Sequence, residues 1–226
     1  MDKALSWLAK TLDYQFHDQQ LFEQALTHRS ASGLSNERLE FLGDAVLDFV
    51  VSELVYDALP QADEGDLSRL RASLVKDTTL AQLASELGLG EHLILGSGER
   101  KSGGHRRDSI LADALEAVFG AVFLDTGYAA SRKVVENAFG DRLRDLPDPS
   151  ELRDPKSRLQ EWLQARQMTL PEYDLVKVTG EPHRQQFEVR CTVVGSKSTA
   201  TGNGASRRGA EQESAQRMLS NLTESE

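Results

Sequence analysis

The sequence predicts a multidomain chain: an all-α domain followed by a small α+β domain in the order helix, strand, strand, strand, helix. Three observations predict it. Apolar residues recur at three- and four-residue spacing through residues 1–145, as they do in amphipathic helices. Beyond residue 172 the spacing changes to period two. Between these parts, residues 145–155 hold three of the six prolines, which is typical of a linker. We place the domains at 1–146 and 154–224, with the linker at 147–153.

The first domain is expected to contain five helical stretches. Asp18 can cap a helix that continues to Leu26, and Asn36 can cap a longer helix that ends near residue 56. Gly88 and Gly127 are expected helix ends. The glycine-rich residues 97–109 are expected to form a mobile loop. The other helical stretches are residues 66–87, 108–124 and 128–143.

The second domain is expected to be an antiparallel sheet covered by two helices. In its middle strand, Phe187, Val189, Cys191 and Val193 alternate with polar residues and should face the core. The expected helices are residues 156–167 and 206–222, and the expected strands are residues 172–179, 184–194 and 196–201. The inner face of the last helix should consist of Ala210, Ser214, Ala215, Met218, Leu219 and Leu222.

Composition excludes several classes of protein. The single cysteine, Cys191, excludes an intrachain disulfide and indicates a buried thiol in a reducing compartment. No segment has the apolar length of a signal peptide core or a membrane span, so we expect a cytoplasmic protein without a membrane partner. The formal charge is −10, and residues 1–153 carry the whole acidic excess, with 26 acidic and 16 basic residues. Such a domain can meet a polyanion only through divalent cations or local basic residues.

Acidic residues within two apolar segments are the first chemical signal. At about 100° per residue, Glu37, Glu40 and Asp44 share one helix face, and Asp113 and Glu116 lie one turn apart in the second segment. Neighbouring carboxylates that are partly buried repel one another, so arginine partners, protonation or a divalent cation must compensate. Carboxylate oxygens are the ligands that Mg²⁺ prefers.

A simpler interpretation competes with the metal site. The acids can form a solvated stripe, or they can pair with Arg38, Arg69 or Arg71. Two such acidic pairs in apolar helices, unmatched by basic residues on the same face, favour the metal site. Gly43 adds to this, because a glycine inside a helix costs about 1 kcal/mol relative to alanine and is acceptable where another backbone approaches closely.

Several motifs resemble those of the ribonuclease III family. The unbroken string NERLEFLGD at residues 36–44 resembles the family signature, and DSILADALEA at 108–117 resembles its second acidic motif. ALTHRS at 25–30 and DEGDLSRLRASLV at 63–75 resemble stretches that flank the signature in bacterial members. The second domain resembles a double-stranded-RNA-binding domain, so the resemblance covers nearly the whole chain.

The resemblance implies an endoribonuclease that cuts double-stranded RNA with Mg²⁺, or with Mn²⁺ as a substitute, and no small-molecule cofactor. Glu116 would bind the metal directly and Asp44 would position or activate the attacking water. The implied products carry 5′-phosphate and 3′-hydroxyl ends, and the implied substrates are precursor ribosomal RNA and structured messenger RNA. The residues that match the catalytic metal-binding quartet are Glu40, Asp44, Asp113 and Glu116.

The resemblance also implies auxiliary acids and a partner. Glu37 and Glu64 match auxiliary acids near the cleft. Family members form homodimers through the signature helix, and Phe41 suits such a contact, although core packing explains it equally well.

In the second domain the resemblance implies an RNA-binding surface. Ser157, Gln160, Glu161 and Gln164 match the helix that enters a minor groove, and His183 matches the loop that enters the next one. Arg207 and Arg208 begin the last helix, where guanidinium groups and helix amides favour phosphate. Taken singly, each is an ordinary exposed residue, turn residue or solubility charge. Gly209 and Glu213 depart from the lysine- and alanine-rich family pattern, which could lower RNA affinity.

Two other functions compete with the nuclease. The first is an RNA-binding protein that keeps the fold without cutting, and the presence of all four quartet acids counts against it. The second is a helical Mg²⁺–diphosphate enzyme such as a prenyl synthase, which would need an absent DDxxD cluster. His28 is expected only to pack or to form hydrogen bonds.

Overall fold

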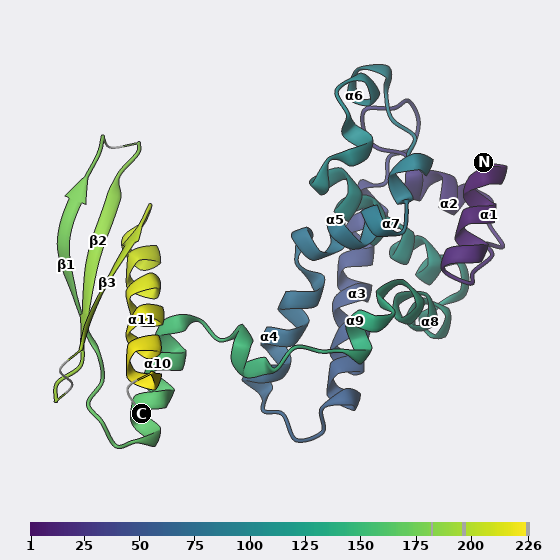
Figure 1. Cartoon of the computed structure of the whole chain (residues 1–226). Helices are drawn as coiled ribbons and strands as arrows, with labels where there is room; N and C mark the ends of the chain where they lie inside the picture. The colour runs from purple at the N-terminus through teal and green to yellow at the C-terminus, as the bar shows by residue number, and fades with distance from the viewer. Residues whose placement is uncertain (182, 196–197, 225–226) are drawn as a thin grey trace. The chain divides into compact units, whose positions relative to one another are not determined.

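The computed structural model describes residues 1–181, 183–195 and 198–224 of the chain. The chain forms two compact units, Met1–Pro149 and Ser150–Glu226, and each is described by itself (Figure 1). The first unit is helical, and the second has the order helix, three strands, helix. The predicted fold class is therefore confirmed.

The first unit is built around α3 and α7, which cross each other at its centre (Figure 1). Both helices are strongly apolar, and α7 buries most of its residues. No helix in the described part of the chain is both long and apolar enough to span a membrane. The α-helices are α1 Asp2–Thr11, α2 Gln19–Leu26, α3 Glu37–Ala58, α4 Glu64–Val75, α5 Asp77–Glu86, α6 Ser97–Lys101, α7 Asp108–Thr126, α8 Tyr128–Phe139 and α9 Asp141–Arg144. Short 3₁₀ turns lie at Leu89–His92, Gly104–Arg106 and Pro149–Leu152.

Several helix boundaries differ from the prediction. The expected helix at 66–87 is two helices, because Lys76 adopts an extended conformation with ψ 146°. The expected helix at 128–143 breaks at Gly140, whose φ is 52°. Asp18 caps α2 as predicted, through a 2.9 Å bond from the Gln20 amide. Asn36 occupies the N-cap position of α3 as predicted, but its side chain forms no capping hydrogen bond.

The prediction of a mobile loop at residues 97–109 is also wrong, since α6 and a 3₁₀ turn occupy most of it. An ion pair within the segment and a backbone contact with a distant residue hold it in place. Arg107 pairs with Glu99 at 2.8 Å, and the Gly96 amide donates to Ser30 Oγ at 3.0 Å. A Cβ at Gly96 would lie 2.1 Å from the Ser30 carbonyl oxygen, so the two segments touch through their backbones.

Two glycines allow α3 and α7 to meet backbone to backbone. A Cβ at Gly43 would lie 1.8 Å from the carbonyl oxygen of Glu116, and one at Gly120 would lie 2.2 Å from that of Leu39. Real Cβ atoms essentially never approach other atoms so closely. The predicted close approach at Gly43 is confirmed, and Gly120 is its counterpart on α7.

The second unit is a three-stranded antiparallel sheet with the strand order β1-β2-β3, and two helices pack on one face of it (Figure 1). Cys191 on β2 pairs with Tyr173 on β1 and Ala200 on β3. The thiol is buried, and every residue of the predicted inner face of the last helix is buried as well. The elements are α10 Pro155–Ala165, β1 Glu172–Thr179, β2 Gln186–Thr192, β3 Thr199–Gly204 and α11 Arg207–Thr223.

Strand β3 lies closer to the C-terminus than predicted. It covers Thr199–Gly204 rather than residues 196–201, of which 196 and 197 lie outside the described residues. Gly202 and Gly204, which lie beyond the predicted end of the strand, are part of it. A Cβ at Gly202 would lie 2.2 Å from the Ser214 amide nitrogen, so glycine lets β3 lie directly against α11.

Candidate functional site

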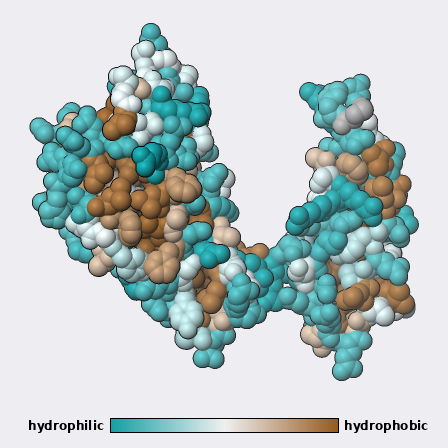
Figure 2. All heavy atoms as spheres, turned by 180° about the vertical axis from the view of Figure 1, so that it is seen from behind, coloured by the Kyte–Doolittle hydropathy of each residue, from teal (hydrophilic) through white to brown (hydrophobic). Residues whose placement is uncertain are grey.

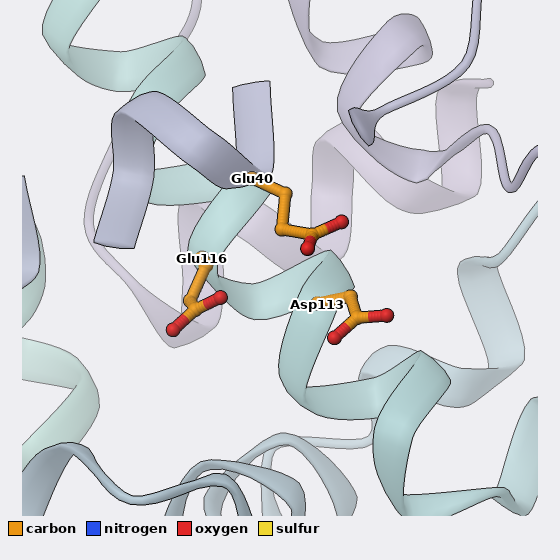
Figure 3. Close-up of side chains that lie close together, drawn as sticks. All are labelled: Glu40, Asp113 and Glu116. Carbon is orange, nitrogen blue, oxygen red and sulfur yellow. The ribbon is translucent and has the colours of Figure 1, made fainter. Parts of the chain in front are cut away.

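Three carboxylates from two helices come together where α3 and α7 cross. Glu40 comes from α3, and Asp113 and Glu116 come from successive turns of α7. One oxygen atom of each lies within 4.8 Å of the others, and Figure 3 shows the three side chains around one common space. The backbone contact at Gly43 and Gly120 brings the helices close enough for this cluster to form.

The described basic side chains do not pair with the acids of this cluster, and the pKa values of the acids are raised. Burial raises the pKa of Glu116 to about 8, with further contributions from Asp44, Glu40 and Asp113. Burial is also the main reason that the pKa values of Glu40 and Asp113 are raised, and Arg29 opposes both shifts only in part. Within the described residues, no ion pair joins these carboxylates to a basic side chain.

The alternative of pairing with nearby arginines is therefore wrong. Arg69 pairs with Asp66 at 2.5 Å, and Arg71 donates to Ser52 Oγ at 3.1 Å. A divalent cation fits the cluster, because hard oxygen ligands and excess negative charge are what such ions require.

Asp44 lies at the edge of this cluster. It is exposed and one turn beyond Glu40 on α3, and its charge is the largest electrostatic contribution to the raised pKa of Glu116. Asp77, the first residue of α5, raises the pKa values of Asp44, Asp113 and Glu116. Asp77 could not be predicted as a site residue from the sequence, because its place beside α7 depends on the helix break at Lys76.

A polar cavity of about 610 Å³ opens beside the acids. Glu40 and Asp113 lie in its wall, and Arg29 and Arg107 line it as well. Neither arginine was predicted as a site residue from the sequence. Arg29 follows α2 and Arg107 directly precedes α7, and only the tertiary fold brings the two side chains to the acids. The cavity lining is His28, Arg29, Ser30, Asn36, Glu37, Glu40, Glu99, Arg107, Ser109, Ile110 and Asp113.

Comparison with known protein families supplies the identity. The family model described as Ribonuclease-III-like matches residues 18–143, more than half of the chain, and includes the whole acidic cluster. The chain belongs to the ribonuclease III family. A second family model, the double-stranded RNA binding motif, matches residues 155–222, which are the helices and sheet of the second unit.

Relatives in the ribonuclease III family are similar over almost the full chain. Ribonuclease 3 of Methylococcus capsulatus is 54% identical over 224 residues, which are 99% of this chain and 97% of that protein. Ribonuclease 3 of Nitrosococcus oceani is 53% identical over 98% of this chain and 96% of that protein. The nuclease domain of ribonuclease III from Campylobacter jejuni has a TM-score of 0.60 and 40% identity, and the match covers 65% of this chain and 99% of that domain.

The auxiliary residues suggested by the ribonuclease III resemblance lie in different places. Glu37 lines the cavity, accepts a 2.9 Å hydrogen bond from Ser35 and lies 3.7 Å from Arg29. Glu64 begins α4, accepts a bond from Ser68 at 2.8 Å and belongs neither to the acid cluster nor to the cavity wall. Phe41 is 81% exposed, so the interpretation as a core residue is wrong. His28 forms the expected hydrogen bond, with Ser30 at 2.8 Å.

In the second unit, α10 presents polar residues to solvent. Gln160, Glu161 and Gln164 are exposed, and Glu161 pairs with Arg153. Ser157 donates to Asp154, the N-cap of α10, at 2.7 Å. His183 lies in the turn between β1 and β2, 3.5 Å from Glu181. All of these side chains are accessible or partly so.

Arg207 and Arg208 are exposed at the first two positions of α11. The Gly209 amide donates to Ser206 Oγ at 3.1 Å, so a serine cap supports the helix start that glycine weakens. Glu213 pairs with Arg217 at 2.6 Å and also accepts from the amide of Asn203 on β3. Glu213 therefore links α11 to the sheet within this unit.

Proposed function

We infer that the chain is a double-stranded RNA endonuclease that hydrolyses phosphodiester bonds. One observation carries the inference: three carboxylates with raised pKa values meet at the α3–α7 crossing of a ribonuclease III family member. The double-stranded RNA binding motif in the second unit supports the substrate class.

The acid cluster would hold Mg²⁺, for which Mn²⁺ can substitute. Glu40, Asp113 and Glu116 offer carboxylate oxygens within 4.8 Å of one another, and Asp44 is the fourth acid we assign to the site. Mg²⁺ binds the deprotonated carboxylates, so it would displace the proton of Glu116, whose pKa is raised to about 8, more readily as the pH rises. When bound, Mg²⁺ lowers the pKa of a water molecule and offsets negative charge on the phosphate.

Hydrolysis requires a positioned water and a positioned phosphate. We assign Asp44 the role of orienting the attacking water and accepting its proton, since it lies exposed beside Glu116. Water attacks phosphorus as the bond to the 3′ oxygen breaks, which leaves 5′-phosphate and 3′-hydroxyl ends. Arg29 and Arg107 in the cavity wall are suited to the phosphate oxygens of the RNA strand. Glu37 and Glu64 remain proposed auxiliary acids.

The second unit would bind the duplex across its grooves. Polar residues of α10, which are Ser157, Gln160, Glu161 and Gln164, would face one minor groove, and His183 would face the next. Arg207 and Arg208 at the start of α11 would contact the phosphates between them. We propose that residues 1–146 form the nuclease domain, 147–153 the linker and 154–224 the RNA-binding domain.

The active form would be a homodimer. Figure 2 shows that apolar side chains gather on one face of the first unit. On α3, Phe41, Phe49 and Tyr56 are 81%, 62% and 69% exposed, an unusual group for the surface of a monomer. A structure of the Campylobacter jejuni nuclease domain with a TM-score of 0.56 and 42% identity, matching 60% of this chain and 98% of that domain, is described as flexible in a region involved in dimer formation. We propose Phe41 as a dimer contact.

Cleavage of a long RNA duplex tests the function directly. Duplex and single-stranded RNA are incubated with the full chain in Mg²⁺ and then in EDTA. We expect cutting of the duplex alone, in Mg²⁺ alone. Binding of the duplex by folded protein without cutting would instead favour an RNA-binding protein without catalysis. Structured precursor ribosomal RNA and messenger RNA are the substrates to test next.

A further inference from the structure

In the second unit, one carboxylate joins the beginnings of two helices. Helices α10 and α11 pack side by side on the same face of the sheet (Figure 1). Glu211, in the second turn of α11, accepts a hydrogen bond from Lys156 Nζ at 2.7 Å and another from Arg207 Nε at 3.0 Å. Lys156 lies in the first turn of α10, so Glu211 links the two helix starts.

The link is partly shielded from solvent. The side chain of Glu211 is 15% exposed and that of Lys156 is 35% exposed. Lys156 Nζ also lies 4.3 Å from the centre of the Tyr173 ring on β1. The hydrogen bond from Lys156 is the main reason that the pKa of Glu211 is lowered. A charged hydrogen bond in such surroundings holds its geometry better than an exposed surface pair.

Positive charge gathers where α10 and α11 begin, and Glu211 offsets part of it. Both helix starts carry the positive end of a helix dipole, and Lys156, Arg207 and Arg208 add three cations. Two acids offset this charge. Asp154 caps α10, and its pKa is lowered mainly by the hydrogen bond from the Ser157 hydroxyl and least by the charge of Arg208. Glu211 pairs with Lys156 and Arg207.

We propose that Glu211 is a positioning residue for duplex RNA. It fixes the distance between the polar face of α10 and the cationic start of α11. The inference rests on the proposed function, in which α10 enters a minor groove and α11 binds phosphate. A duplex presents these features at a fixed spacing, and a protein surface that is already set to that spacing loses less conformational freedom on binding.

Net charge and the positioning role predict opposite changes in RNA affinity when Glu211 is replaced by glutamine. Removing an acid from a surface that binds RNA should strengthen binding, because one repulsive charge is lost. The positioning role predicts that Glu211→Gln weakens binding. The sign of the change therefore separates the two explanations.

The experiment measures the affinity of the full chain for an RNA duplex in EDTA, over a range of salt concentrations. We expect Glu211→Gln to weaken binding about tenfold, as coupled contacts of this kind do. Glu213→Gln is the matched control: it removes the same charge from the same helix, but its partners are Arg217 on α11 and the Asn203 amide on β3. This control should bind at least as tightly as the unmodified chain. In Mg²⁺, Glu211→Gln should raise KM and leave kcat unchanged at saturating RNA.

A double-variant cycle tests the link itself. If Lys156 acts through Glu211, then Lys156→Gln and the double variant should bind no worse than Glu211→Gln alone. Unchanged or tighter binding by Glu211→Gln, or additive effects of the two substitutions, would overturn the proposal.

Two further measurements distinguish failure of the proposed function from failure of the positioning role of Glu211. Failure of the unmodified chain to bind duplex RNA would refute the proposed function, whereas normal binding by Glu211→Gln refutes only the positioning role. Thermal unfolding checks that the variant is folded. If it is not, Glu211→Asp decides instead: its shorter side chain cannot reach both cations, so weaker binding supports the proposal and unchanged binding overturns it.

Discussion

The crossing of α3 and α7 makes the acid cluster sensitive to a single methyl group. In Gly43→Ala the new Cβ would lie 1.8 Å from the carbonyl oxygen of Glu116, whereas ordinary contact begins at 3.4 Å. The helices must then separate by about 1.6 Å at this point. Glu40 lies one turn before Gly43, so the separation moves Glu40 away from Glu116 and Asp113.

Gly43→Ala should lower both the free energy of unfolding and kcat. Overpacking of a closely packed contact lowers the free energy of unfolding by about 1–3 kcal/mol. The higher helix propensity of alanine offsets about 1 kcal/mol of this loss. We therefore expect the free energy of unfolding of Gly43→Ala to fall by up to about 2 kcal/mol. A displacement of about 1 Å in a catalytic group can cost 10²-fold in rate, so kcat should fall by at least about that factor. Affinity for Mg²⁺ should weaken as well.

The assay combines chemical denaturation, cleavage of duplex RNA over a range of Mg²⁺ concentrations, and Mn²⁺ binding by electron paramagnetic resonance. Gly98→Ala is the matched control, because it lies in α6 and a Cβ there meets nothing within 4 Å. A Gly43→Ala protein with unchanged kcat and unchanged Mn²⁺ affinity would refute the argument that this crossing sets the spacing of the acids.

The remaining predictions concern charge, domains and stability. Glu116→Gln should abolish cleavage and leave RNA binding nearly intact; loss of binding would contradict the metal-site assignment. The pKa of Glu116 is raised to about 8 from its ordinary 4.5, so the metal-free fold favours the protonated acid. Its stability should therefore fall as pH rises from about 4.5 to 8, measured by urea denaturation, and cleavage should need more Mg²⁺ at lower pH. Removal of residues 151–226 should weaken RNA binding in a salt-dependent way while some cleavage survives at low salt. Complete loss at every salt would mean that the second unit does more than tether RNA. Asp125, whose side chain is 2% exposed, accepts bonds from Tyr14 Oη at 2.6 Å and the Asp18 amide at 2.9 Å. Asp125→Ala should lower the free energy of unfolding by about 3 kcal/mol. Since the pKa of Asp125 is lowered by these hydrogen bonds despite its burial, that stabilisation should be present at neutral pH and lost in acid.

Features that depend on local spacing could be predicted from the sequence. The shared face of Glu40 and Asp44 follows from helical periodicity, and so does the buried face of α11. The close approach at Gly43 followed from the cost of glycine inside a helix. The change from helical to alternating spacing predicted the order of elements in the second unit.

Features that depend on contacts between distant segments could not be predicted. Asp77 reaches the acids because the chain breaks at Lys76, a residue without a strong local signal for a helix end. Arg107 faces the cavity because α6 and the following turn are ordered by Glu99 and by the contact of Gly96 with Ser30. A glycine-rich, polar composition suggested mobility there, and tertiary contacts outweighed it.

The acidic side chains of the first unit lack basic partners at the cluster, whereas those at the start of α11 are paired with basic side chains. This difference explains how a chain with net negative charge can bind RNA. In the first unit the acids of the cluster repel one another, so a phosphate can approach only with a cation between them. In the second unit, Glu211 and Glu213 are bonded to neighbouring basic side chains, while Arg207 and Arg208 remain exposed at the helix start. Dependence on divalent metal should therefore arise in the first unit and dependence on salt in the second. Glu116→Gln should change the dependence of cleavage on divalent metal and leave the salt dependence of RNA binding unchanged. Glu211→Gln should change RNA binding and its salt dependence and leave the dependence on divalent metal unchanged.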